Sequence, residues 1–360
     1  MSSTASANPD GKRQPRVRID RLAHVHYQHP SLERANQFFK DFGFIPAKET
    51  STHIYYRGFG SQPFIYVAEQ SPTQERKFVG ACWVVVSLED LQNAATLPGA
   101  SKVLDMPDDV PGGGKFVVLK DPNGFGVMFV YGQTLRDVDS TPLADIKTNT
   151  ALTKVRKGQF RRYELGPSRV HKLGHFGLVV KKEDFKRTVE WYTETMALAL
   201  SDAVYDPKTG EDQMKFFHVD KGLEWVDHHS FFLATAKPGE PAHIHHSSFE
   251  VDDMDTQLLG HDWLEKKGWT NCWGIGRHVL GSQIFDYWFD ASGNIVEHYA
   301  DGDLVNSTTP ASREAAAPNT IYIWGPNVPL AFLTGKIEDV GRAPSALTGQ
   351  PAAGIEGAKA

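Results

Sequence analysis

The feature that most constrains this chain is an internal repeat. Residues 21–26 (RLAHVH) parallel residues 172–177 (KLGHFG), and residues 121–128 (DPNGFGVM) parallel residues 290–297 (DASGNIVE). Between these segments, residues 79–86 (VGACWVVV) parallel residues 243–251 (HIHHSSFEV). Because each copy repeats the same strand and turn signals in the same order, the pattern predicts two similar modules in one chain.

The two copies differ in residues that can bind a metal. Aligning the three segments places His24, Ala81 and Met128 of the first copy opposite His175, His246 and Glu297 of the second. Two imidazoles and one carboxylate, with positions left open, are the ligands typical of a non-heme Fe(II) oxygenase. We therefore predict one metal site per chain, formed by the second copy.

Strand alternation selects one histidine of an adjacent pair. His245 and His246 are neighbours in a predicted strand, so their side chains are expected on opposite faces. The His246 face also carries Ser248 and is polar, whereas the His245 face continues into Phe249. Glu297 is acidic where the other copy is apolar, which predicts an inward carboxylate that needs a metal or a cationic partner. His246 and Glu297 are therefore the preferred ligands.

Composition excludes several classes of function. The 360 residues carry a formal net charge of -6 and no block of Lys or Arg, so we expect no nucleic-acid surface. No stretch approaches the roughly 18 apolar residues of a membrane span, and the first 18 residues do not resemble a signal peptide. Only Cys82 and Cys272 are present, which favours a reducing compartment. These features predict a soluble cytoplasmic protein without a membrane partner.

Each copy is expected to run from a strand through a helix into several further strands. Helices are predicted at 31–42, with Ser31 as N-cap and Gly43 after the last turn, and at about 185–196. This alternation indicates an α+β fold. The expected organisation is a disordered N-terminal segment (1–18), an N-terminal domain without an intact metal site (19–133), a linker (134–168), a C-terminal catalytic domain (169–335) and a flexible tail (336–360).

Over residues 19–335 the pattern resembles the vicinal-oxygen-chelate superfamily, and within it the type I extradiol catechol dioxygenases. The most specific part is the run from Gly276-Arg-His278 through Tyr287 to Glu297. The resemblance implies tandem paired βαβββ modules, with two domains that each form a curved, barrel-like mixed sheet around a cavity. It also implies that the metal triad lies in one domain only, in agreement with the repeat.

The resemblance further implies an activity and its residues. His175, His246 and Glu297 match the family's metal ligands, His229 matches its acid–base histidine, and His278 and Tyr287 match groups that hydrogen-bond substrate and oxygen. The implied cofactor is Fe(II), with Mn(II) as the alternative, and the implied reactants are O2 and a catechol cleaved beside its diol. A homo-oligomer is also implied. Gly177 departs from the family, which often has a polar residue there.

Two alternatives remain: a 4-hydroxyphenylpyruvate dioxygenase-like enzyme, which would use the same ligand set, and a metal-free binding or resistance protein, which would not need the triad. Glyoxalase-type lyases usually take ligands from both modules, and Ala81 and Met128 argue against that arrangement here. The expected pocket walls are aromatic and favour an apolar substituent on the catechol, although Arg277 is close enough to pair with a carboxylate; the wall residues are Phe231, Phe285, Trp273 and the segment Ile321–Trp324. The histidines left without a role are His26, His53, His171, His218, His243, His261 and His298.

Overall fold

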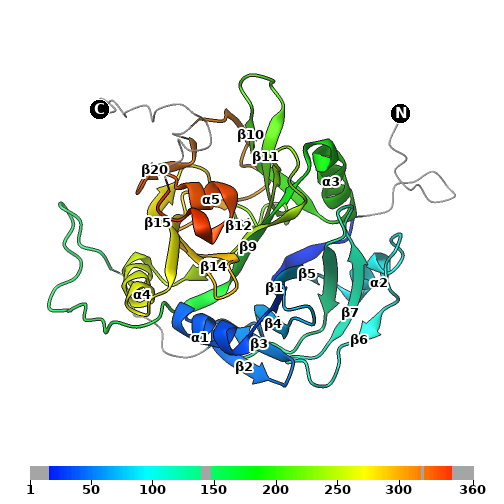
Figure 1. Ribbon diagram of the computed structural model, residues 1–360, viewed down its shortest axis with the longest axis horizontal. Coiled ribbons are helices and arrows are strands. Elements are labelled where there is room, and N and C mark those ends of the chain that lie inside the picture. The colour runs from blue at the N-terminus through cyan, green and yellow to red at the C-terminus, as the bar shows by residue number, and fades with distance from the viewer. Residues whose placement is uncertain (1–15, 139–146, 318–319, 343–360) are drawn as a thin grey trace.

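The computed structural model describes residues 16–138, 147–317 and 320–342. It contains four βαβββ units, arranged as two units in each of two modules (Figure 1). The N-terminal units are β1 Ile19–His29, α1 Leu32–Phe42, β2 Ile45–Glu49, β3 His53–Arg57 and β4 Tyr66–Gln70, then β5 Lys77–Val85, α2 Leu88–Ala94, β6 Leu104–Asp105, β7 Lys115–Lys120 and β8 Gly126–Tyr131.

The C-terminal module repeats this order and adds to it. Its units are β9 Val170–Val180, α3 Lys182–Thr195, β10 Leu198–Tyr205, β11 Asp212–Val219 and β13 Phe231–Thr235, then β14 His243–Val251, α4 Met254–Lys266, β15 Thr270–His278, β16 Ile284–Phe289 and β17 Ile295–Ala300. The additions are β12 Val226–Asp227, β18 Leu304–Val305, β19 Ser312–Ala315, β20 Tyr322–Trp324, α5 Leu330–Thr334 and a 3-10 turn at Ile337–Asp339.

Each module is one curved mixed sheet whose two units meet at its centre. The N-terminal order is β2-β3-β4-β1-β5-β8-β7-β6, with β1 and β5 antiparallel. The C-terminal order is β19-β10-β11-β13-β9-β14-β17-β16-β15-β20, with β9 and β14 antiparallel. The paired modules and mixed sheets were predicted; within the described residues, neither sheet closes into a barrel.

Local signals explain the first helix. The Ser31 side chain accepts a hydrogen bond from the backbone N–H of Arg34, and Gly43 ends the helix at φ 103°. Both features agree with the prediction, and the buried face of α1 consists of Ala35, Phe38, Phe39 and Phe42. The second predicted helix begins three residues early, at Lys182, where Glu183 and Asp184 in the first turn favour the helix dipole.

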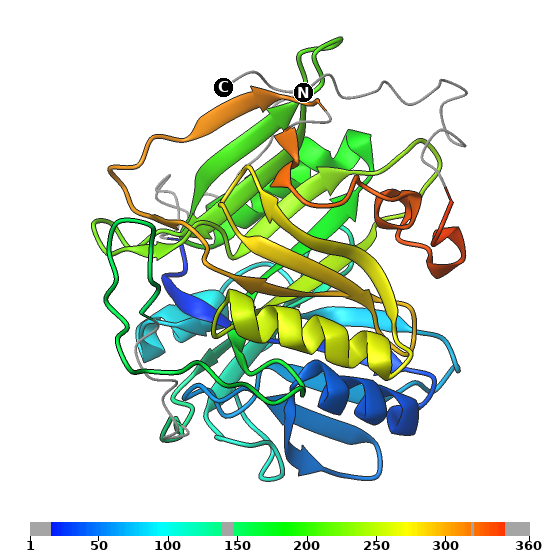
Figure 2. The ribbon, with the colours of Figure 1, turned by 90° about the vertical axis from the view of Figure 1, so that its left-hand side faces the viewer.

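The modules pack through a shared apolar core that hydrogen bonds also cross. Helices α1 and α4 lie side by side (Figure 2), and the ring of Phe42 contacts Phe249 of the other module at a centroid distance of 6.1 Å. Tyr27 on β1 shares a buried 2.7 Å hydrogen bond with Ser247 on β14. The strand that carries His246 is therefore anchored by residues of the N-terminal module.

Residues 1–15, 139–146, 318–319 and 343–360 of the predicted domain plan lie outside the described residues, and the domain boundaries stay predictions. Val17 is buried and its backbone pairs with the end of α3. The described part of 134–168 contains no helix or strand. No helix among the described residues combines the length and the apolar character needed to cross a membrane.

Candidate metal centre

Three neighbouring central strands of the C-terminal sheet bring the predicted ligands together. His175 lies on β9, His246 on β14 and Glu297 on β17. Nε2 of His175 is 3.2 Å from Nε2 of His246 and 3.2 Å from Oε2 of Glu297, which is 3.3 Å from Nε2 of His246. Bonds of about 2.1 Å to one ion place neighbouring ligand atoms roughly 3.0–3.4 Å apart, so the three atoms fit a common cation.

Burial supports the same interpretation. Glu297 is fully buried, and neither of its carboxylate oxygens has a well-formed hydrogen bond. Burial alone would raise the pKa of Glu297, but the two imidazoles outweigh it and hold that pKa well below its usual range. For His246 burial acts in the other direction and lowers the pKa, which favours the neutral imidazole. A buried carboxylate beside neutral imidazoles is the state that binds a divalent cation.

A β-bulge places a further histidine beside the triad. The pairing of β14 with β9 shifts register between Ile244 and His246, so the alternation expected for this pair is wrong. Nδ1 of His245 is 2.8 Å from Nδ1 of His246. His245 therefore offers an acceptor to the Nδ1–H of His246 and leaves the Nε2 of His246 for a metal.

His229 contacts the triad through His175, and His228 fixes the orientation of its ring. Its ring centroid is 4.1 Å from that of His175, and its Nδ1 is 3.0 Å from Nδ1 of His228. His228 donates from Nε2 to Oδ2 of Asp202 at 2.7 Å. Burial lowers the pKa of His229 well below its usual range, helped by the neighbouring histidines. With His228 donating to Asp202, the neutral His229 donates from Nδ1 and keeps a lone pair on Nε2.

His278 and Tyr287 lie beside two of the triad residues, Glu297 and His246. The Nδ1–H of His278 donates to the carbonyl oxygen of Ile321 at 2.8 Å, so its Nε2 accepts from the Tyr287 hydroxyl at 2.8 Å. That Nε2 is also 3.9 Å from Oε1 of Glu297. Burial lowers the pKa of His278 to about 4. The six predicted site residues therefore occupy one contiguous region.

The aromatic wall differs in part from the prediction. Phe231 faces the core, where it packs on Phe176, and Phe232 faces the site instead, with its ring 5.1 Å from that of His246. Because a Cβ on Gly177 would lie 1.9 Å from the Phe232 ring, this glycine is required where the family often has a polar residue.

Phe285 and Trp273 lie beside the site as expected, since Phe285 stacks on His278 and Trp273 stacks on Tyr287. Strand β20 instead forms the edge of the sheet next to β15, with Ile323 and Trp324 exposed, so the place of the segment Ile321–Trp324 in the wall stays a prediction. Arg277 donates to the backbone oxygen of Ser282 and to Oδ2 of Asp301, so its guanidinium is already engaged.

The first copy lacks a corresponding triad. On β1, His24 pairs with Cys82 of β5, and on β9, His175 pairs with Ser248 of β14. His24 and His175 therefore occupy equivalent positions in the two modules. The same register aligns His246 with Gly80, one residue before the predicted Ala81. A Cβ on Gly80 would lie 2.1 Å from the carbonyl oxygen of Gly126, which leaves no room for a ligand there.

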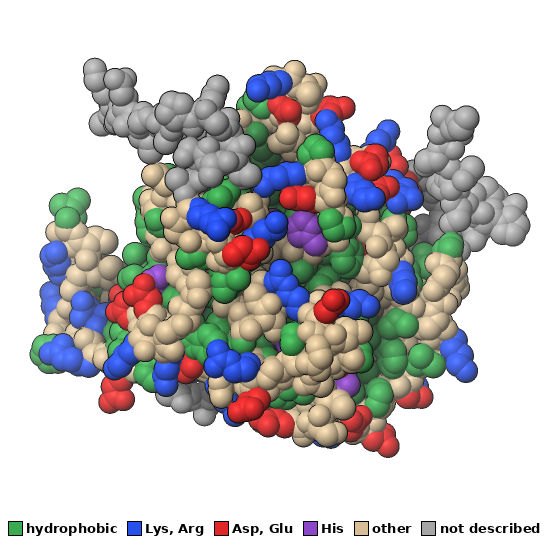
Figure 3. Space-filling model, in the orientation of Figure 1, with side chains coloured by type: hydrophobic (Ala, Val, Ile, Leu, Met, Phe, Trp, Pro, Cys, Tyr) green, Lys and Arg blue, Asp and Glu red, His purple; other side chains and the backbone are tan. Residues whose placement is uncertain are grey.

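A cavity of about 1490 Å³ lies between the two modules. Its N-terminal side includes His24, His26 and Met128, and its C-terminal side includes His245 and Phe332. The triad itself does not line this cavity, but His245 and Phe332 border both. On the face shown in Figure 3, basic and acidic side chains are interspersed.

Known proteins are similar to part of this chain in sequence and to most of it in fold. Residues 172–298 match the Glyoxalase/Bleomycin resistance protein/Dioxygenase superfamily, which confirms the resemblance where it is strongest. Metapyrocatechase 2 of Cupriavidus necator is 35% identical over 150 residues, 41% of this chain and 43% of the relative. The match thus spans less than half of that relative.

Solved structures extend the likeness in fold to most of the chain. Homoprotocatechuate 2,3-dioxygenase from Arthrobacter globiformis has a TM-score of 0.70 at 19% identity, over 90% of this chain and 92% of that one. The Brevibacterium fuscum enzyme in complex with 3,4-dihydroxyphenylacetate has a TM-score of 0.71 at 19% identity, over 89% and 93%. A Mn(II)-bound glyoxalase from Novosphingobium aromaticivorans has a TM-score of 0.67 at 19% identity, over 86% and 92%.

Proposed function

Because residues 172–298 belong to the Glyoxalase/Bleomycin resistance protein/Dioxygenase superfamily, we propose that this protein is a non-heme, Fe(II)-dependent extradiol dioxygenase acting on a substituted catechol. The observation that carries the proposal is the convergence of His175, His246 and Glu297 next to His229, His278 and Tyr287. The likeness to a metapyrocatechase and to catechol-cleaving dioxygenases supports the same reaction.

The three ligands would hold the metal through two neutral imidazoles and one carboxylate. A bound Fe(II) supplies a positive charge that acidifies a catechol hydroxyl and gives both reactants a common binding point. Iron is favoured over Mn(II) because this ligand set with open positions is typical of iron oxygenases, and Mn(II) remains the alternative.

His229 is proposed as the group that moves protons. Its Nε2 carries the lone pair, because its Nδ1–H is used in the contact with His228. It can take the proton of a catechol hydroxyl and return it when the ring opens, a role worth roughly 10²–10⁴-fold in rate. The Tyr287 hydroxyl donates a 2.8 Å hydrogen bond to Nε2 of His278. We assign this pair the stabilisation of negative charge on the reacting oxygens, through the Tyr287 hydroxyl when it turns from His278 toward them.

The surroundings favour an apolar substituent on the catechol. The wall beside the triad consists of Phe232, Trp273 and Phe285, and Phe332 lies where the site borders the large cavity. Arg277, the nearest predicted partner for a substrate carboxylate, is paired with Asp301. An alkyl- or aryl-catechol is therefore the proposed substrate class. The homo-oligomer expected from the resemblance stays a prediction.

Oxygen uptake and the yellow semialdehyde product test this proposal on the Fe(II)-loaded protein. His246→Ala and Glu297→Ala should lose both iron and activity, whereas Glu250→Ala, which removes a β14 carboxylate paired with Lys172, should keep both. His229→Ala should keep iron and lose most turnover.

Two results would contradict the assignment. Full activity after strict chelation would show that the reaction does not depend on a metal. A preference for carboxylated over alkyl- and aryl-catechols that disappears in Arg277→Ala would exclude the apolar pocket and leave ring cleavage in place.

A further inference from the structure

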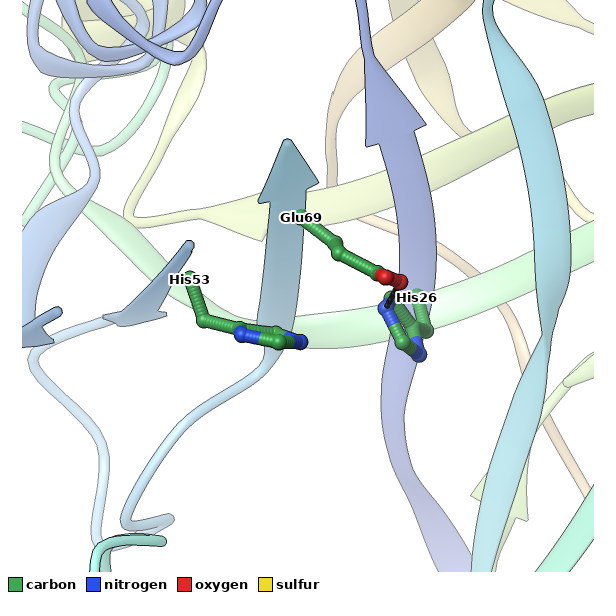
Figure 4. Close-up of side chains that lie close together, drawn as sticks. All are labelled: His26, His53 and Glu69. Carbon is green, nitrogen blue, oxygen red and sulfur yellow. Dashed lines mark ion pairs between the residues drawn. The ribbon is translucent and has the colours of Figure 1, made fainter. Parts of the chain in front are cut away.

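A second group of possible metal ligands lies in the N-terminal module. His26 on β1, His53 on β3 and Glu69 on β4 each offer one ligand atom, and these atoms lie within 4.8 Å of one another (Figure 4). Strand β4 runs between β3 and β1, and the register places His53 opposite Glu69. His26 is opposite Val67, two residues before Glu69, so all three side chains share one face of the sheet.

The three side chains point toward one another. Nε2 of His26 is 2.9 Å from Oε2 of Glu69, and Figure 4 shows the His53 ring directed toward them. Nδ1 of His53 is 2.9 Å from the Thr52 hydroxyl oxygen, which orients the ring and leaves Nε2 for another partner. A metal-binding histidine commonly has its other ring nitrogen held in this way.

The ionisation states suit a cation. The contact with His26 lowers the pKa of Glu69, although burial opposes it, so this carboxylate is charged near neutral pH. Burial lowers the pKa of His53, which favours its neutral imidazole. His26 and Glu69 have side chains 28% and 24% exposed, and His26 lines the large cavity, so an ion can reach the group from solvent.

A second histidine–glutamate pair shows what distinguishes this group. His171 lies 3.0 Å from Glu250, and the third group beside that carboxylate is the ammonium of Lys172, at 3.6 Å. That ammonium neutralises Glu250. Beside Glu69 the third group is the imidazole of His53, which contributes a lone pair instead of a positive charge.

We propose that His26, His53 and Glu69 form a second metal site, separate from the C-terminal triad, for a divalent cation of the zinc type. Two imidazoles and one carboxylate are a zinc ligand set that leaves a coordination position open. The three ligand atoms all lie within 4.8 Å of one another, with His26 and Glu69 already at 2.9 Å, and the three side chains are only partly buried, so their rotation can bring the atoms to the roughly 3.0–3.4 Å that a common ion requires. The site is not the counterpart of the triad, whose equivalents in this module are His24, Gly80 and Met128.

Zinc binding to the anaerobic, Fe(II)-loaded protein tests the site. Equilibrium dialysis followed by elemental analysis should give one zinc per chain in addition to the iron, and Co(II) in place of zinc should give visible d–d absorption bands. His53→Ala and Glu69→Gln should each weaken zinc binding at least about 100-fold, because even removal of a supporting residue costs about 10–100-fold. His171→Ala is the matched control and should bind zinc as the unchanged protein does.

The readout is independent of the catalytic proposal. Iron content and catechol cleavage should be unchanged in His53→Ala and Glu69→Gln, which also shows that both variants are folded. If the protein proves not to cleave catechols, unfolding temperature serves as that control and the zinc measurement stands unaltered. The site is refuted if the unchanged protein binds no second ion, if both variants retain it, or if His171→Ala loses it.

Discussion

The contact between Asp202 and His228 allows the proposed proton-transfer role to be tested without touching the site itself. Burial alone would raise the pKa of Asp202, but hydrogen bonds from His228 and Ser312 outweigh it and lower that pKa. The resulting carboxylate accepts the Nε2–H of His228, which leaves Nδ1 of His228 to accept from His229. In Asp202→Asn the amide can donate to His228 instead, which moves the His228 proton to Nδ1 and reverses the tautomer of His229.

The magnitude follows from the hydrogen bond that is lost. A bond to a charged group contributes about 1.5–3 kcal/mol, and about 1.4 kcal/mol corresponds to a factor of ten. The productive tautomer of His229 should therefore become about 10–150-fold rarer, and kcat for catechol cleavage should fall by a similar factor. Iron content and KM should stay within about twofold, because Asp202 contacts neither the ligands nor the aromatic wall.

Steady-state oxygen uptake and iron analysis on the same samples give the comparison. Asp227→Asn is the matched control. Asp227 precedes His228 by one residue, but its carboxylate pairs with Lys172 and not with the histidines. Its kcat should be nearly unchanged, and Asp202→Glu should recover part of the loss. An Asp202→Asn protein with normal kcat, or one whose loss is explained by missing iron, would refute the proposed orientation of His229.

Other contacts lead to further expected outcomes. His245→Ala should weaken Fe(II) binding about 10–100-fold in a metal titration, because it removes the partner of the His246 Nδ1–H, whereas His243→Ala should not; equal affinities would contradict the role of the bulge. Tyr27→Phe should cost about 1–3 kcal/mol in urea unfolding by leaving the buried Ser247 hydroxyl without its partner, and adding Ser247→Ala should restore most of this. Burial lowers the pKa of His24 to about 3 from 6.5, so its contribution to stability is complete above pH 6.5 and is lost as pH falls toward 3. His24→Phe should reduce the slope of unfolding free energy by about 1.4 kcal/mol per pH unit between those values, and an unchanged slope would contradict the assigned burial effect.

Much of the architecture could be predicted because its signals are local. The Ser31 cap, the apolar face of α1 and the left-handed Gly43 depend only on neighbouring residues, and all three were found as expected. The repeat similarly placed His175 and Glu297 on inward-facing strands, because turn and strand signals recur at the same positions in both copies.

The errors arose where register depends on partners far along the chain. The bulge that brings His245 to His246 has no signature in the histidine pair itself, because it is set by pairing with β9. For the same reason the faces of Phe231 and Phe232 could not be assigned, and the counterpart of His246 was placed on Ala81 instead of Gly80. The group formed by His26, His53 and Glu69 was missed because its members are scattered over three strands.

The continuous core between the modules also determines how the protein should lose its structure. Phe249 sits three residues after His246 on β14, and its ring packs 4.7 Å from Phe44 of the N-terminal module. Melting of either half thus exposes apolar surface of the other and releases the strand that carries a metal ligand. A calorimetric scan should show a single heat-absorption peak in place of two, and the separately expressed halves should be insoluble unless they are mixed during refolding.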